Sequence, residues 1–158
     1  MHAPHAPEQG FTLIETMIAL AIFAIGSMGI LAILTNGFGT TAESNNLTGG
    51  YEMAQNAIGM IRANGGNALQ FNGAVVSKTG SVTMPGSANT VVVQAINSWK
   101  NMLHPAALPP LLPAASGQIA IVPLQGSGMC PCAATISVGW LSSNGIPETY
   151  TVQTIVGY

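Results

Sequence analysis

The side chains that could do acid–base chemistry are few and widely spaced. The 158 residues include five glutamates, no aspartate and three histidines. Beyond the first 34 residues the acids are Glu43, Glu52 and Glu148, and the one histidine is His104. A Ser-His-acid triad would have to use these residues, and no recognisable motif surrounds any of them. We therefore predict no catalytic residue, no cofactor and no enzymatic activity. A membrane-anchored enzyme that depends on His104 is the alternative.

The two cysteines lie close together, as Cys130-Pro131-Cys132. A structural zinc site needs a second cysteine pair or nearby histidines, and the sequence has neither, so we predict no metal site. In an oxidising compartment the two thiols can form a disulfide, with their Cα atoms near the upper end of the accepted range. Reduced thiols, or pairing with another chain, are the alternatives.

One carboxylate, Glu15, lies in an apolar run from Phe11 to Leu34. As a helix these about 24 residues would be about 36 Å long, enough to cross a hydrocarbon core of about 30 Å. A carboxylate inside a spanning helix costs about 2.5–3.5 kcal/mol, so it should have a partner. A plain membrane anchor offers Glu15 only the headgroups. A secretory signal peptide would have a basic start and a shorter apolar stretch.

The sequence GFTLIE, which follows a short polar leader and precedes MIALAIFAIG, resembles the class III signal of type IV prepilins and pseudopilins. The resemblance implies that a membrane peptidase cuts after Gly10 and methylates Phe11. Residues 1–10 would be the leader, and Glu15 the fifth residue of the mature chain. The leader departs from the family pattern because it contains no lysine or arginine.

The resemblance also implies a partner for Glu15. In an assembled filament its carboxylate would pair with the terminal amine of a neighbouring subunit, so that two costly charges offset each other. Small side chains in the apolar run would let neighbouring helices approach closely. These residues are Ala19, Ala21, Ala24, Gly26, Ser27, Gly29 and Ala32.

The composition excludes some other classes of function. Charged residues make up 5% of the chain and the formal net charge is −2, so there is no clustered basic face for nucleic acid. The length suits one modest domain. Beyond the apolar run the chain is rich in uncharged polar residues, which is typical of exported proteins.

Helical spacing returns after residue 50. Tyr51, Ala54, Ile58 and Ile61 share one face, which predicts the exposed half of a long N-terminal helix docked on a globular head. Glycines before this segment, at positions 37, 39, 49 and 50, should loosen the helix, and the residues 64–67 should end it.

The rest of the chain predicts a small α+β head. A second helix should begin near residue 90 with Asn89 or Thr90 as its cap, although three consecutive valines also allow a strand there. Prolines at positions 105, 109, 110 and 113 exclude regular structure over 103–116. The remaining predictions are a loop at 70–89 with a short strand at 81–84, strands at 118–122, 134–141 and 149–156, and a turn at 142–145.

Taken together, these features predict a type IV pilin fold of the α+β class. Residues 11–34 would form the transmembrane half of the helix, and residues 35–158 its periplasmic part and the head on a small antiparallel sheet. Landmarks in the head (MIRAN, then INSWKNML before prolines, then a strand ending in Trp140) resemble PilV-type minor pilins.

The resemblance implies a minor pilin that helps initiate a type IV pilus or lies at its tip. Its partners would be other minor and major pilins, the prepilin peptidase and the assembly platform, and it would move from the inner membrane, with its head in the periplasm, to a pilus on the cell surface. A type II secretion pseudopilin and a tip adhesin that binds through loops around Gly126–Gly128 are the alternatives.

Overall fold

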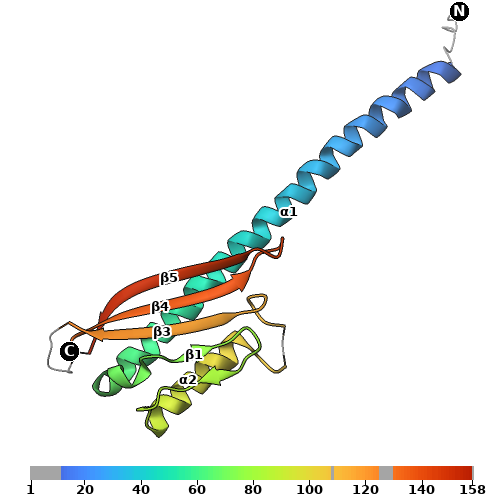
Figure 1. Cartoon of the computed structure of the whole chain (residues 1–158). Coiled ribbons are helices and arrows are strands. Elements are labelled where there is room, and N and C mark those ends of the chain that lie inside the picture. The colour runs from blue at the N-terminus through green and yellow to red at the C-terminus, as the bar shows by residue number, and fades with distance from the viewer. Residues whose placement is uncertain (1–11, 108, 125–129, 158) are drawn as a thin grey trace, which may run out of the picture. The chain divides into compact units, whose positions relative to one another are not determined.

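The structure is a computed structural model that describes residues 12–107, 109–124 and 130–157. The chain divides near Thr40 into two compact units. The helical elements are α1 (Leu13–Ala63), the 3-10 helix η1 (Gly65–Phe71) and α2 (Thr90–Leu103), and the strands are β1 (Val75–Val76), β2 (Val82–Thr83), β3 (Ser116–Pro123), β4 (Cys132–Leu141) and β5 (Pro147–Val156) (Figure 1).

Helix α1 runs without a break through its glycines, so the expectation that they loosen it is wrong. Gly37 and Gly39 have open space around them, and in a 51-residue helix the cost of about 1 kcal/mol for each is spread over many backbone bonds. Gly49 and Gly50 have a packing reason, because a Cβ at either position would press on side chains of the head. The predicted end of the helix is confirmed at Ala63.

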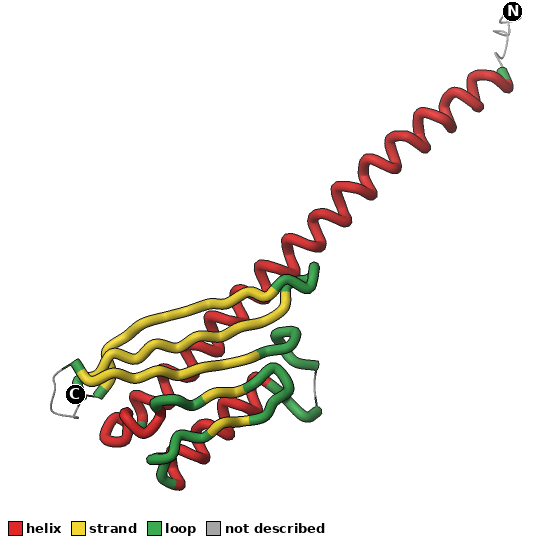
Figure 2. The backbone as a smooth tube through the Cα atoms, viewed as in Figure 1, coloured by secondary structure: helices red, strands yellow, loops and turns green. Residues whose placement is uncertain are grey.

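The head contains one five-stranded antiparallel sheet with the order β2-β1-β3-β4-β5 (Figure 2). All three predicted long strands are confirmed and begin somewhat earlier than expected. In β4 buried and half-buried residues alternate strictly, so Ile136, Val138 and Trp140 face the core. The turn into β5 is closed by Ser142 and Ile146, and Gly145 adopts a φ of 75°.

Helix α2 packs against the core of the head, and the ring of Trp99 on this helix lies against Gly117 of β3. Its buried residues are the predicted Val92, Ile96, Trp99 and Leu103. The side chain of Asn89 accepts a hydrogen bond of 3.0 Å from the backbone N–H of Val92, which is an N-cap. The sequence allowed either a helix or a strand at the three consecutive valines, residues 91–93. The Asn89 cap and the helical spacing of the apolar residues explain why a helix forms there.

Two tryptophans connect the layers of the head. Trp99 donates a buried hydrogen bond of 2.9 Å from Nε1 to the carbonyl of Met53 on α1, and Gly117 of β3 leaves room for its ring. Trp140 lies against Gly50, where a Cβ would come within 2.5 Å of the ring atom Cζ3. Glycine is therefore required at the points where a helix and a strand meet these rings.

The head segment of α1 also contacts β5, the edge strand of the sheet. Tyr51 and Tyr150 pack edge to face with ring centroids 6.0 Å apart, and Arg62 donates a 2.9 Å hydrogen bond to the Thr154 hydroxyl. Tyr51 is 48% exposed, so its predicted place on the buried face is wrong. Its ring covers the edge of the sheet instead of entering the core. The face itself is confirmed by the burial of Ala54, Ala57, Ile58 and Ile61.

Two elements of the head, η1 and β1, were not predicted. Both lie in a region where the sequence shows no sustained hydrophobic period, and β1 is only two residues long. The arrangement as a whole is nevertheless the predicted one. A long N-terminal helix with an apolar first part packs its later part on an antiparallel sheet, which is an α+β, type IV pilin-like arrangement.

Replacing Gly50 by alanine should destabilise the head by about 1–3 kcal/mol, because the added methyl group overlaps the Trp140 ring. Urea unfolding of the full chain in nonionic detergent, followed by tryptophan fluorescence, measures the change, since both tryptophans lie in the head. Gly59→Ala is the matched control. Gly59 is exposed on the same helix with open space around it, so alanine there should stabilise by about 0.5–1 kcal/mol. Equal effects of the two substitutions would contradict the packing argument.

Candidate functional site

The strongest candidate for a functional residue is Glu15, in the first turn of α1. Its side chain is exposed, and its carboxylate has no hydrogen-bond or ion-pair partner among the described residues. A negative charge in the first turn interacts favourably with the helix dipole, by about 0.3–1 kcal/mol. This gain is smaller than the cost of about 2.5–3.5 kcal/mol for a carboxylate within a bilayer. The helix alone therefore does not stabilise the charge in an apolar surrounding.

The other polar side chains of the apolar run form hydrogen bonds within their own helix. Between Leu13 and Leu34 these are Thr16 and Ser27, whose hydroxyls donate 2.8 Å hydrogen bonds to the carbonyls of Leu13 and Phe23 on the preceding turn. Such bonds let a hydroxyl enter hydrocarbon at little cost. Between Leu13 and Leu34, Glu15 is thus the one side chain that needs a partner from outside its own helix.

The surface around Glu15 is apolar on all sides of the helix. Every large hydrophobic side chain from Leu13 to Leu34 is between 49% and 79% exposed. By length and composition α1 is able to cross a membrane. So much apolar surface is covered in a protein's working state either by lipid or by other apolar helices.

The remaining predicted residues of this region, Gly10 and Phe11, lie outside the described residues. So do the loop residues Gly126–Gly128. The processing site and the adhesive loops therefore stay predictions.

Residues 6–34 match the protein family described as the prokaryotic N-terminal methylation motif. This motif is a prepilin-type signal, so the match supports a type IV pilin-like or pseudopilin subunit that prepilin peptidase processes and that assembles with other pilins. It points to a structural subunit rather than an enzyme, and with the apolar helix it fits membrane anchoring. No curated protein and no solved structure matches the chain.

The possible triad residues do not come together in the described structure. His104 ends α2, and its Nε2 lies 3.1 Å from the carbonyl oxygen of Ser77. Since a carbonyl only accepts, Nε2 carries the hydrogen, and the imidazole packs beside Gly80. Among the described residues, no hydrogen bond joins His104 to a glutamate. Its position indicates a packing residue.

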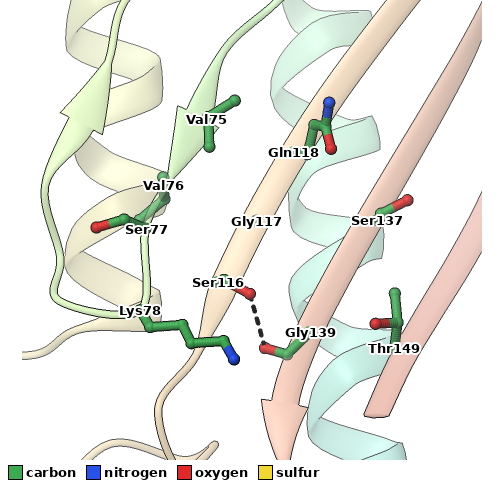
Figure 3. A pocket seen from close by; sticks show the side chains of 10 residues that line it. All are labelled: Val75, Val76, Ser77, Lys78, Ser116, Gly117, Gln118, Ser137, Gly139 and Thr149. Carbon is green, nitrogen blue, oxygen red and sulfur yellow. Dashed lines mark hydrogen bonds between the residues drawn. The ribbon is translucent and has the colours of Figure 1, made fainter. Parts of the chain in front are cut away.

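A hollow of about 380 Å³ lies on the outer face of the sheet (Figure 3). Lys78 points toward Gly139 there, and the floor carries the hydroxyls of Ser116, Ser137 and Thr149. Its lining includes no carboxyl, imidazole or thiol group. Lys78 is the one side chain of this lining that could act as a general acid or base, and the lining offers it no second such group to work with. Among the described residues, no three potential metal ligands gather at one point.

The fold does bring together two glutamates that sequence reasoning considered only separately. Glu43 of α1 and Glu148 of β5 are 105 positions apart in the chain, yet Glu43 is the neighbour that changes the pKa of Glu148. The hydrogen bond with Glu43 raises the pKa of Glu148 above its ordinary value, and partial desolvation and repulsion from the Glu43 charge raise it further. No local pattern signals this pair, because it depends on the docking of β5 against α1.

The structure joins Cys130 and Cys132 by a disulfide at the start of β4. The Cα atoms are 4.5 Å apart, near the lower end of the usual range and not the upper end that the spacing suggested. The reason is a bend of the backbone at Cys130 and Pro131. Gly157, with a φ of 72°, lies against Cys130, where a Cβ would come within 2.5 Å of the cysteine Cβ. The bridge therefore packs beside the end of β5.

We predict that both cysteines are oxidised in the exported protein. Thiol labelling in denaturant should give no label without reductant and two labels per chain after reduction, because Cys130 and Cys132 are the chain's two cysteines. Each single Cys→Ser variant, as a control, should show one label without reductant. Full labelling of the unreduced wild type would contradict the bridge.

Proposed function

We propose that this chain is a minor pilin, a structural subunit that helps initiate a type IV pilus or lies at its tip. The observation that carries the proposal is the carboxylate of Glu15, which has no partner among the described residues and lies at the start of an exposed apolar helix. The methylation motif over residues 6–34 supports it, and so does the resemblance of the head landmarks to PilV-type minor pilins. Such a subunit serves adhesion, twitching motility or DNA uptake through the pilus.

In this proposal the chain enters the inner membrane with residues 11–34 in the bilayer and its head in the periplasm. Prepilin peptidase removes residues 1–10 and methylates Phe11. The assembly platform then adds the subunit to other minor and major pilins, and the pilus carries it to the cell surface.

Glu15 acts in this proposal as the residue that fixes assembly. The cut after Gly10 creates an amine on Phe11, so every processed subunit has one positive and one negative charge at the start of its apolar helix. Packing of neighbouring helices brings the carboxylate of one subunit to the amine of the next, away from water. Breaking such a buried pair costs about 3–5 kcal/mol, because the remaining charge has no partner.

A pseudopilin of a type II secretion system is the alternative that shares this motif. A minor pilin and a pseudopilin differ in the filament that they enter. Neighbouring genes for minor pilins would favour the first, and neighbouring genes for a secretion system would favour the second.

Processing at Gly10 is tested by replacing that residue. Gly10→Val should leave the unprocessed precursor in the membrane, since a peptidase pocket that fits glycine has no room for a branched side chain. Intact-mass measurement of membrane-extracted protein distinguishes the precursor from a chain that begins with methylated Phe11. Gln9→Ala, one position earlier, should be processed normally. Normal processing of Gly10→Val would reject this cleavage site.

The role of Glu15 is tested by Glu15→Val, which should leave processing and insertion intact but abolish association with other pilins. The expected loss corresponds to about 3–5 kcal/mol for an unpaired charge. Crosslinking between subunits in membranes measures association. Thr16→Val is the matched control, because its hydroxyl bonds within its own helix and its loss should change little.

A plain membrane anchor predicts a different result. Without the carboxylate the helix should insert at least as well, and association should stay at the wild-type level. Equal crosslinking of the Glu15 and Thr16 variants would therefore contradict the proposed function.

A further inference from the structure

The hollow on the outer face of the sheet forms where strand pairing ends and a side chain is missing (Figure 3). Strand β1 ends at Val76, which pairs with Gly117, so the pairing of β1 with β3 stops before Ser116. Ser116 pairs with Gly139 of β4, where a Cβ would come within 2.8 Å of the Ser116 Oγ. The volume of about 380 Å³ is at the low end of the range for ligand sites, about 300–1,000 Å³. The hollow therefore suits a small ligand.

Lys78 gives the hollow its positive charge, and the loop that carries this residue is held in place. Its ammonium group has no ion-pair or hydrogen-bond partner among the described residues. Within the loop, Ser77 and Gly80 donate backbone hydrogen bonds of 2.8 Å and 2.9 Å to the carbonyls of Ser81 and Ser77. His104 of α2 donates to the Ser77 carbonyl as well. Because the backbone is already fixed, only the lysine side chain has to be ordered when a ligand binds.

No carboxylate of the described strands competes with a ligand for this ammonium group. Glu148 is the one charged residue in the five strands, and it pairs with Trp140, whose side chain lies in the core. Residues directly opposite each other on paired strands point to the same face. The Glu148 side chain is therefore on the opposite face from the hollow, and an anion bound beside Lys78 would meet one cation and no carboxylate in the lining.

The other polar groups of the lining are uncharged and can both donate and accept hydrogen bonds. The Gln118 amide and the Thr149 hydroxyl have no partner among the described residues, and Ser137 shares a 3.0 Å hydrogen bond with Thr151. These groups come from three neighbouring strands, so they are spread over about 10 Å. Sugar hydroxyls also both donate and accept, so a ring with several hydroxyls matches this spread better than a simple anion does.

We propose that the hollow binds a uronic acid, a sugar with one carboxylate, which places the carboxylate at Lys78 and the ring hydroxyls at Gln118 and Thr149. One carboxylate balances one lysine, whereas a phosphate group would bring a charge of about −1.5 to −2. The lining contains no aromatic ring on which a sugar could stack, so binding depends on charge and hydrogen bonds. The Kd should therefore be on the order of 1 mM.

The proposal goes beyond the minor pilin function and does not depend on it, because the hollow belongs to the head alone. The site is also separate from the predicted adhesive loops around Gly126–Gly128. Those residues follow the end of β3 in the chain, whereas the hollow lies at the start of this strand.

Saturation-transfer NMR on the full chain tests the proposal, in a polyoxyethylene detergent that has no sugar headgroup. Glucuronate and galacturonate are the probes, and glucose, acetate and glucose 6-phosphate are the comparisons. At least one uronate should bind saturably and about tenfold more tightly than glucose or acetate. The proposal is overturned if neither uronate binds at about ten times the expected Kd, if glucose or acetate binds equally well, or if glucose 6-phosphate binds more tightly.

Two variants locate the binding in the hollow. Lys78→Gln should weaken uronate binding about tenfold or more, because the carboxylate loses its charged partner. Lys100→Gln is the matched control, since it removes the same charge from α2, outside the lining. Gly139→Ala narrows the floor and should weaken uronate binding too. Tryptophan fluorescence checks that each variant is folded. Equal uronate binding by the two lysine variants would overturn the proposal, whatever the outcome of the assembly experiments.

Discussion

Helix α1 has to meet two different surroundings with one continuous backbone, and the rest of the structure depends on this constraint. From Leu13 to Leu34 its apolar side chains are exposed on all sides, whereas from Met53 to Ile61 they are buried on one face. The first pattern suits lipid or neighbouring apolar helices, and the second suits the core of a head. In the first segment Glu15 has no partner among the described residues, and the proposed role in assembly rests on this observation.

Close packing of side chains, more than charge interactions, holds the later part of α1 to the rest of the head. Gly50 accommodates the ring of Trp140, Gly117 accommodates Trp99, and the hydrogen bond from Trp99 to Met53 joins the helices. Nε1 of Trp140 is buried and has no hydrogen-bond partner among the described residues, so the Trp140 ring contributes through packing. A head that depends on packing needs few charged residues, and charged residues make up 5% of the chain.

Local patterns predicted the elements whose signals lie within a few residues. The spacing of Val92, Ile96 and Trp99 with the Asn89 cap predicted α2, and strict alternation around Val138 predicted β4. The two residues of β1 are too few to show a period. The Glu43–Glu148 pair and the room that Gly50 leaves for Trp140 arise only from contacts between distant segments. For the same reason the sequence identifies Glu15 as unusual but does not identify its partner, which we propose lies in another subunit.

The central claim is that this chain becomes part of a filament. The most direct measurement is mass spectrometry of filaments sheared from cells that produce the protein at its natural level. The account predicts that the sheared fraction contains the chain at low abundance, with methylated Phe11 as its first residue. If the chain stays wholly in the membrane fraction while filaments are recovered, the account is contradicted.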